Sequence, residues 1–389
     1  MTADASGGPQ GGAFAVPAGA GARVAIGPEG GEGVGRVTLQ TVAAAVGVSR
    51  MTVSNAFSRP DQLSPALRER ILATAAELGY SGPDPAARAL ARGQVGAVGV
   101  VMTDSLGDAF LDPVAAAFFG AVAEELAPTG LAVSLIPANT IGDRSAARDL
   151  AIDAALIYAC AGDAESVKWL QRRNLPIVSV DREPEPTGAS IRLDERAGGR
   201  LAAQHLIDLG HSDIAVFTID PSQTGQGWVD DPRGQLDNHV ADERLRGVLA
   251  ATDAAGLEIR VFHVKDNHDR FVVPGAAAIV ADQDRPHAVI CFSDVMAAAL
   301  SAAAQAAGLA VPADLSVVGY DDSRLASAVT PALTTVRQDF VAKGRAAARA
   351  LIGAIDAVRA GTELPLPAED VIVPVDLVVR GSTGAPRKL

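Results

Sequence analysis

The stretch VTLQTVAAAVGVSRMTVSNAF, residues 37–57, contains two short helical patterns separated by a single tight turn. Thr38 can cap a first helix with its hydroxyl, and Gly47 supplies the left-handed residue that ends it. Ser49 then caps a second helix. The side chains expected to face inward are Val42, Ala45, Val46, Val53, Ala56 and Phe57. Two helices joined this closely predict a helix-turn-helix.

Two more helical patterns follow. In SPALRERILATAAELGY, residues 64–80, Ser64 is the expected cap, and an apolar stripe repeats at helical spacing. In GPDPAARALARGQ, residues 82–94, Asp84 can cap a helix that Gly93 ends after barely two turns. A helix this short is marginal in isolation. The stripe of the longer helix consists of Leu67, Ile71, Ala75 and Leu78.

The second helix of the helix-turn-helix exposes residues suited to DNA. Such a helix lies in the major groove and offers its N-terminal side chains to base edges. Arg50 can reach guanine acceptors, Met51 can touch a thymine methyl, and Asn55 can pair with adenine or bind a phosphate. Thr52 and Ser54 are expected to contact phosphates, and Thr38 and Ser49 are further expected DNA-binding residues. The alternative is an ordinary solvated face of a three-helix bundle.

Charge is unevenly distributed along the 389 residues, whose formal net charge is -13. Residues 35–94 contain seven arginines and four carboxylates, so this segment is +3 and the remainder is -16. A basic module on an acidic body is expected when only one end of a protein meets a polyanion. The alternative is a chance fluctuation of a few charges.

The composition also indicates the cellular compartment. Cys160 and Cys291 both lie within apolar runs, where buried small hydrophobes are favoured over a disulfide or a metal site, so a reducing compartment is expected. The sequence shows neither an apolar run long enough to cross a membrane nor a signal peptide. A soluble cytoplasmic protein follows, with no cofactor. Residues 1–34, rich in Gly, Ala and Pro, are expected to be a disordered tail.

Beyond residue 94 the chain alternates apolar, β-branched runs with Ala- and Leu-rich helical patterns. Seven such runs are present, among them VGAVGVVM, DIAVFTI and LSVVGY. The alternation predicts parallel sheets covered by helices on both faces. Seven runs over about 240 residues favour two doubly wound domains, with a ligand in the cleft between them.

Residues 37–57, LSPALRERILATAAELGY and AARALARG, together with the later SVVGYDD and PALTTVRQDF, resemble the LacI/GalR family of bacterial transcriptional regulators. The resemblance implies a helix-turn-helix domain at 35–81, a hinge helix at 82–94, and an effector-binding and dimerisation domain at 95–389 that resembles a periplasmic binding protein. Its first lobe is expected at 95–192 and 323–355, and its second at 193–322 and 356–380. Leu90 matches the family's minor-groove wedge, with one residue more between Tyr80 and Leu90 than the family pattern has, and plain packing is the alternative.

The same resemblance implies an effector site between the lobes. Every expected polar residue falls at a strand end or a helix start, where this fold places ligands. A carboxylate pair with an arginine suits a polyhydroxyl ligand, so a sugar is favoured. The expected effector residues are Phe110, Asp181, Arg244, Phe271, Ser293 and Asp321. The alternative is that these aspartates cap helices, the role expected for Asp294, and that the arginine pairs with them structurally. Trp228, in the long loop 220–242, either closes the cleft or lies on the surface.

The predicted function is a homodimeric repressor that binds a palindromic operator under the control of the effector. Whether the effector relieves or promotes DNA binding stays open. A solute-binding protein without a DNA role is the alternative, but it has no use for residues 49–57. An enzyme is disfavoured, because the sequence shows no GxGxxG after a strand, no GxSxG and no paired histidines.

Overall fold

The computed structural model describes residues 37–84, 89, 93–102, 110, 112–138, 145–159, 164–182, 187–222, 225–229, 231 and 233–387. The chain divides into two units after Arg88. The tail expected at 1–34, Cys160, Leu90 and most of the expected hinge helix lie outside the described residues.

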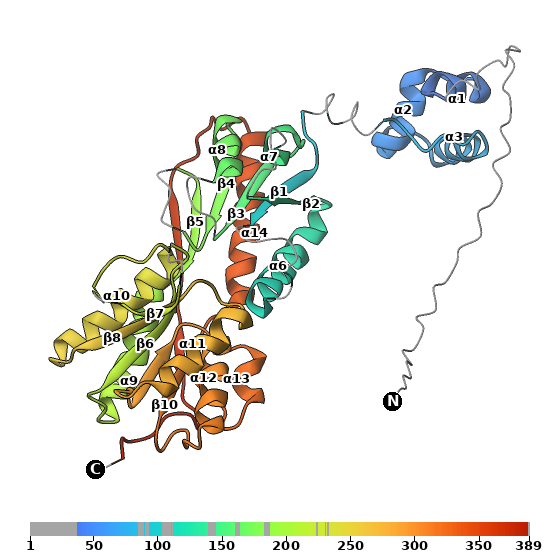
Figure 1. Cartoon of the computed structure of the whole chain (residues 1–389). Helices are drawn as coiled ribbons and strands as arrows, with labels where there is room; N and C mark the ends of the chain where they lie inside the picture. The colour runs from blue at the N-terminus through green and yellow to red at the C-terminus, as the bar shows by residue number, and fades with distance from the viewer. Residues whose placement is uncertain are drawn as a thin grey trace, which may run out of the picture. The chain divides into compact units, whose positions relative to one another are not determined.

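The described residues of the N-terminal unit form three helices in the predicted order: α1 (Leu39–Val46), α2 (Arg50–Ser58) and α3 (Pro65–Glu77), with a 3-10 turn at Pro60–Gln62 (Figure 1). Thr38 caps α1, and Gly47 ends it in the left-handed region at φ 76°. Ser49 caps α2 by accepting a hydrogen bond from the Thr52 amide. Local capping chemistry, visible in the sequence, therefore sets the boundaries of these helices.

One small core holds the three helices together. Its fully buried members are Val42, Ala43, Val53, Ala56, Ile71 and Ala75. Ala45 was expected to face inward but is exposed, and Ala43 is buried instead, because α3 covers that side of α1. Phe57 is partly buried and meets Tyr80 edge to face at 5.7 Å between ring centroids. Leu78, the last member of the predicted stripe, is exposed.

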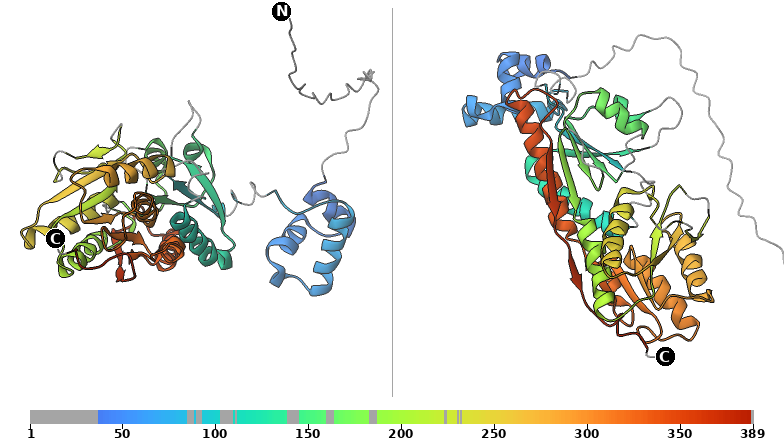
Figure 2. Two further views of the ribbon diagram at one scale, coloured as in Figure 1. Left: turned by 60° about the horizontal axis from the view of Figure 1, so that its bottom comes forward. Right: turned by 90° about the vertical axis from the view of Figure 1, so that its left-hand side faces the viewer.

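The second unit contains two lobes, each built on one sheet with helices on both faces (Figures 1 and 2). The sheet of lobe one has six parallel strands in the order β12-β5-β4-β3-β1-β2. These are β1 (Ala97–Met102), β2 (Ala132–Pro137), β3 (Ala154–Tyr158), β4 (Ile177–Val180), β5 (Ala189–Leu193) and β12 (Glu369–Val373). Helices α6 (Pro113–Leu126) and α14 (Phe340–Arg359) cover one face, and α7 (Ala146–Asp149) and α8 (Glu165–Arg172) cover the other.

The sheet of lobe two has seven strands in the order β13-β11-β10-β9-β6-β8-β7, parallel except at its two edges. These are β6 (Ile214–Ile219), β7 (Gly227–Trp228), β8 (Ile259–Val264), β9 (Ala288–Cys291), β10 (Ser316–Asp321), β11 (Thr334–Arg337) and β13 (Asp376–Val378). One face carries α9 (Glu195–Asp208) and α10 (His239–Ala254). The other carries α11 (Asp269–Ala281), α12 (Asp294–Ala306) and α13 (Arg324–Ala328).

The chain passes between the lobes after β5, after β11 and after β12. The first crossing matches the expected boundary near residue 193. The other two were predicted too early: α13 and β11 belong to lobe two rather than lobe one, because β11 pairs with β10. The end of α14 and β12 belong to lobe one, because β12 pairs with β5. The predicted two doubly wound lobes are otherwise present.

Candidate functional site

The exposed face of α2 carries the side chains predicted to meet DNA. Arg50 is exposed, and Met51 is 69% exposed, the largest exposed fraction among the large apolar residues that the structure describes. Thr52, Ser54 and Asn55 are partly exposed. An exposed methionine next to an arginine, at the start of the second helix of a helix-turn-helix, is placed for contact with base edges.

Two of the expected DNA-binding residues, Ser49 and Thr38, also cap helices. The Ser49 hydroxyl accepts from the Thr52 amide at 3.0 Å and lies 2.8 Å from the Thr52 hydroxyl. Thr38 forms a capping box with Thr41 at the start of α1. Asn55 donates to Gln62 at 3.0 Å, a contact that the sequence did not reveal and that fixes the amide beside the turn after α2.

In the second unit, the aspartates predicted to bind an effector have strained backbones. Asp181, which follows β4, has φ 53°, and Asp321, which ends β10, has φ 114°. Asp322 follows with φ 54°. Left-handed conformations at residues other than glycine cost roughly 1–3 kcal/mol each and cluster at binding and active sites. All three lie at the carboxyl ends of parallel strands, where ligands bind in this class of fold.

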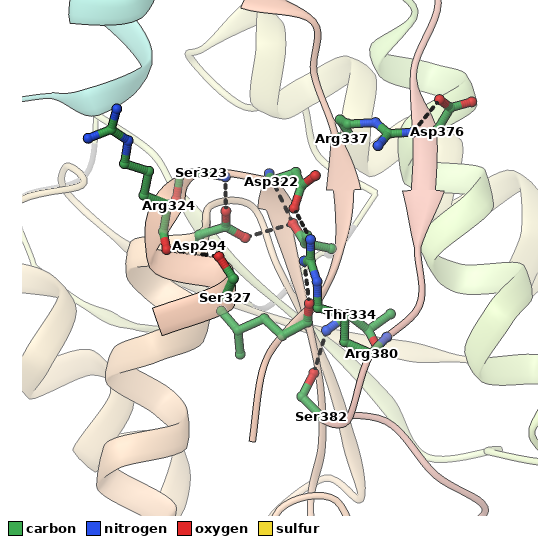
Figure 3. A network of polar contacts seen from close by, with 12 residues as sticks. Asp294, Asp322, Ser323, Arg324, Ser327, Thr334, Arg337, Asp376, Arg380 and Ser382 are labelled. Carbon is green, nitrogen blue, oxygen red and sulfur yellow. Dashed lines mark hydrogen bonds and ion pairs between the residues drawn. The ribbon is translucent and has the colours of Figure 1, made fainter. Parts of the chain in front are cut away.

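Side chains from several elements hold the turn after β10 in place (Figure 3). Arg380, near the C-terminus, donates to Asp322 at 2.5 Å and to the Leu333 carbonyl at 2.9 Å. Asp294 accepts from the Ser323 amide at 2.7 Å and from the Thr335 hydroxyl at 2.6 Å. These contacts join β10, β11, α12 and the C-terminal segment around one strained turn.

Asp321 and Asp294 are both buried, and their pKa values rise. Burial raises the pKa of Asp321 well above its ordinary value, and the neighbouring Asp294 raises it further. Burial likewise raises the pKa of Asp294 from 3.8 to about 6. The Gln338 amide donates to Asp321 at 2.5 Å. Two carboxyl groups in one buried region favour at least one neutral form, which can donate as well as accept a hydrogen bond.

Arg244, predicted to be an effector ligand, already has protein partners. Its guanidinium donates to both oxygens of Glu195, at 2.7 and 3.2 Å, and to the Phe292 carbonyl at 2.5 Å. It also lies 3.6 Å from the centroid of the Tyr320 ring. Burial opposes its charge, but Glu195 outweighs burial and raises the pKa of Arg244. The structure thus makes Arg244 one half of a buried ion pair that lies close enough to Asp321 to influence its pKa.

Glycines bring α9 and α10 close enough to form this pair. A Cβ on Gly199 would lie 2.0 Å from the Arg244 carbonyl oxygen, and one on Gly247 would lie 2.0 Å from the Arg196 carbonyl oxygen. Each helix therefore places a glycine against the backbone of the other. Glu195, in the first turn of α9, consequently meets Arg244 on α10.

Lobe one contributes a second buried ion pair, which the sequence reading missed. The Lys343 ammonium, from the first turns of α14, donates to Asp181 at 2.5 Å. The side chains of Lys343 and Asp181 are 1% and 8% exposed. A signal was present in the sequence: Lys343 sits at helical spacing from Ala347 and Leu351, within the apolar stripe of α14, where an unpartnered lysine would be costly.

The other predicted effector residues are distributed more loosely. Ser293, rather than Asp294, caps α12 by accepting from the Met296 amide, and its hydroxyl donates to Asn267 at 2.7 Å. Phe271 packs partly buried against a core cluster of lobe two. Phe110 is 57% exposed. The structure therefore brings Ser293 near the strand ends, whereas it shows no aromatic pairing of Phe110 or Phe271 with another ring among the described residues.

Trp228 covers the edge of the sheet of lobe two. Its ring meets Phe262 edge to face at 5.1 Å, and its indole nitrogen donates to Asp282 at 2.5 Å. Arg260 lies over the ring. All these partners belong to lobe two, so the interpretation of Trp228 as a surface residue fits better than that of a cleft lid.

Across the described part of the chain, every helix is too short or too polar to span a lipid bilayer. The same residues include no cluster of three or more side chains suited to hold a metal ion. Cys291 is a buried free thiol at the end of β9, as predicted.

Both units match known protein families. Residues 38–82 match bacterial regulatory proteins of the lacI family, and residues 203–383 match the periplasmic binding protein-like domain. An HTH-type transcriptional regulator of Mycolicibacterium smegmatis is 37% identical over 373 residues, covering 90% of this chain and 97% of the relative.

Two solved structures are also similar over most of the chain. A complex of the transcriptional regulator CelR with cellobiose has a TM-score of 0.62 at 29% identity, covering 89% of this chain and 100% of the other. The lac repressor dimer bound to operator and the anti-inducer ONPF has a TM-score of 0.72 at 25% identity, covering 90% and 99%. With its helix-turn-helix followed by two parallel-sheet lobes, the chain belongs to the lacI family of DNA-binding bacterial transcriptional regulators, which are not enzymes.

Proposed function

We propose that the protein is a homodimeric repressor whose affinity for a palindromic operator is controlled by a sugar bound between its two lobes. The observation that carries the proposal is the strained turn at Asp321 and Asp322, which the buried Gln338 and the partly buried Arg380 hold at the carboxyl end of β10. Backbone strain kept in place by so many contacts is typical of a ligand site.

For the DNA-binding end, we assign base contacts to Arg50, Met51 and Asn55. Thr38, Ser49, Thr52 and Ser54 would contact the DNA backbone, and Leu90 would enter the minor groove. The exposure of Met51 supports this assignment, since an apolar side chain on a solvated helix face has no other apparent partner among the described residues. Two-fold symmetry of the operator follows if two copies present α2 to adjacent half-sites.

For the effector end, Asp181, Arg244, Ser293 and Asp321 would surround the ligand, with Phe110 and Phe271 at the margin. The similar regulator CelR was solved in complex with cellobiose, which supports a sugar here. Dimerisation is supported by the lac repressor dimer and by exposed apolar side chains along the edge strand β2, Val133 and Leu135.

The test is fluorescence anisotropy with labelled DNA from upstream of the gene, comparing wild type with Arg50→Ala at several salt concentrations. We expect tight, palindrome-dependent binding that Arg50→Ala weakens by about 1–3 kcal/mol at the contacted base pair. Arg70→Ala, an exposed arginine on α3, is the control for loss of charge alone. Binding by wild type that is equally weak for every DNA sequence would refute the proposal.

A further inference from the structure

The strongest feature that the family assignment leaves unexplained is the buried pair of Asp181 and Lys343. We infer that the two side chains form a clamp for a vicinal diol: Asp181 accepts from one hydroxyl, and Lys343 donates to the neighbouring oxygen. The clamp selects an uncharged polyol over its phosphorylated or carboxylated counterpart. This inference rests on the proposed function of the cleft and adds to it a specificity-determining residue, Lys343.

Both side chains of the pair have hydrogen-bonding capacity that the described residues do not use. Asp181 uses Oδ2 to accept from Lys343, while Oδ1 is buried and finds no hydrogen-bond donor among the described residues. An ammonium has three hydrogens, and Asp181 is the only acceptor that the described residues give Lys343. A buried carboxylate oxygen without a donor is costly in a purely structural ion pair. A ligand hydroxyl would satisfy it.

The surroundings hold the pair in position for such a ligand. The Lys343 ammonium lies 5.6 Å from the Phe118 ring centroid and 5.8 Å from that of Tyr158. These two rings are stacked with centroids 4.8 Å apart. Asp181 has the strained backbone at φ 53° noted above. The aromatic rings stabilise the cation by their quadrupoles.

Asp181 also borders the space between the lobes. It lines a small cavity of about 20 Å³ together with Glu195 and Glu243 of lobe two. A cavity of this size has room for about one water or hydroxyl oxygen. The pair of lobe one and the Glu195–Arg244 pair of lobe two therefore approach the same space, and each pair is neutral as a unit.

Neutrality of the pair determines the ligand class. While Asp181 occupies the ammonium, Lys343 offers hydrogen bonds without a net positive charge to attract an anion. Replacing Asp181 by asparagine keeps the shape but leaves the positive charge of Lys343 uncompensated. The same change should therefore weaken binding of a neutral polyol and strengthen binding of an anionic one, a reversal that a merely structural ion pair does not predict.

The experiment uses the full-length protein and three matched ligand pairs: D-glucose with D-glucose 6-phosphate, cellobiose with cellobionate, and D-ribose with D-ribose 5-phosphate. Binding is measured by isothermal titration calorimetry, and operator binding by anisotropy in parallel. We expect wild type to bind at least one neutral member about tenfold or more tightly than its charged counterpart. Asp181→Asn should reverse that preference, and Lys343→Met should lose the neutral ligand by about tenfold or more.

Two further variants separate the clamp from a fold-stabilising pair. The double variant Asp181→Asn/Lys343→Met removes both charges and should remain folded, yet lose the neutral ligand without gaining the charged one. Arg345→Met, on the same helix but about half exposed and paired with Glu125, should bind as wild type does. Thermal unfolding of each variant confirms that it is folded.

The clamp is overturned if the double variant binds the neutral ligand like wild type, if Asp181→Asn loses ligands without a reversal, or if no neutral member of the panel binds wild type. Failure of the proposed function would look different, because wild type would then lack sequence-specific operator binding whatever the ligand result.

Discussion

Replacing Arg244 by methionine should destabilise lobe two severely, because it leaves the Glu195 carboxylate buried without its partner. Both side chains are less than a tenth exposed. The change removes two hydrogen bonds to Glu195, one to the Phe292 carbonyl and the contact with the Tyr320 ring. Breaking one side of a buried ion pair costs about 3–5 kcal/mol. The free energy of unfolding of lobe two should fall by that amount.

Urea denaturation can measure this loss in one lobe. The chain has two tryptophans: Trp169 in lobe one and Trp228 in lobe two. In a Trp169→Phe background, fluorescence reports lobe two through Trp228, whose ring packs on Phe262. With a slope of about 2–3 kcal/mol/M, a loss of about 3–5 kcal/mol lowers the urea midpoint by about 1–2.5 M.

A matched control and a double variant sharpen the result. Arg246→Met, two residues along α10 at a side chain that is 50% exposed, should lower the urea midpoint far less than Arg244→Met, because solvent screens an exposed ion pair. Glu195→Gln combined with Arg244→Met removes both charges, so it should cost much less than the sum of the single changes. If Arg244→Met and Arg246→Met shift the midpoint equally, the buried pair does not stabilise lobe two as argued.

Three further predictions concern the same lobe. Gly247→Ala places a methyl group 2.0 Å from the Arg196 carbonyl oxygen, so it should lower the free energy of unfolding, measured by urea denaturation, by about 1–3 kcal/mol or more. The control Ala250→Gly, on the exposed face of α10, should lower it by about 1 kcal/mol or less. Equal effects would contradict close packing of α9 and α10. Burial is the main cause that raises the pKa of Asp294 from 3.8 to about 6. The stability that Asp294 contributes is therefore present below pH 3.8 and is lost as pH rises through about 6. Asp294→Asn should flatten that part of the plot of stability against pH, and an unchanged slope would contradict this assignment. Burial lowers the pKa of His211 from 6.5, although the Gly384 carbonyl, which accepts its hydrogen bond, acts in the opposite direction. The stability that His211 contributes is therefore present above pH 6.5 and is lost as pH falls through its lowered pKa. His211→Gln should remove this loss of stability in acid, measured by thermal unfolding between pH 5 and 7.5 at about half-unit steps, and a loss that persists in the variant would place its origin elsewhere.

Some of the fold could be derived from local sequence because local chemistry sets it. Thr38, Ser49 and Ser64 cap helices where the sequence placed them, since a hydroxyl at a helix start meets a free amide whatever the rest of the chain does. The strongly apolar runs became β1, β3 and β10 because a central parallel strand is buried on both faces.

Strands that depend on their neighbours were missed. The segment IRVFHV became β8, which lies next to the short edge strand β7, and TTVR became β11. Both contain polar residues, so their apolar runs are too short to stand out, and only pairing with β6 and β10 makes them strands. The misplaced lobe crossings have the same origin, because they are defined by β11 and β12.

The sequence by itself determined the helix-turn-helix, the exposed face of its second helix, the two-lobed α/β class and the carboxylates at strand ends, because each follows from periodicity, capping or position along a strand. Only the tertiary structure decided which charges meet: Arg244 with Glu195, and Asp181 with Lys343 from a helix 162 residues away. Ion pairs between distant segments leave no periodic trace in a sequence. They arise when sheet order and close helix packing bring two buried charges together, since neither charge is tolerated inside the protein alone.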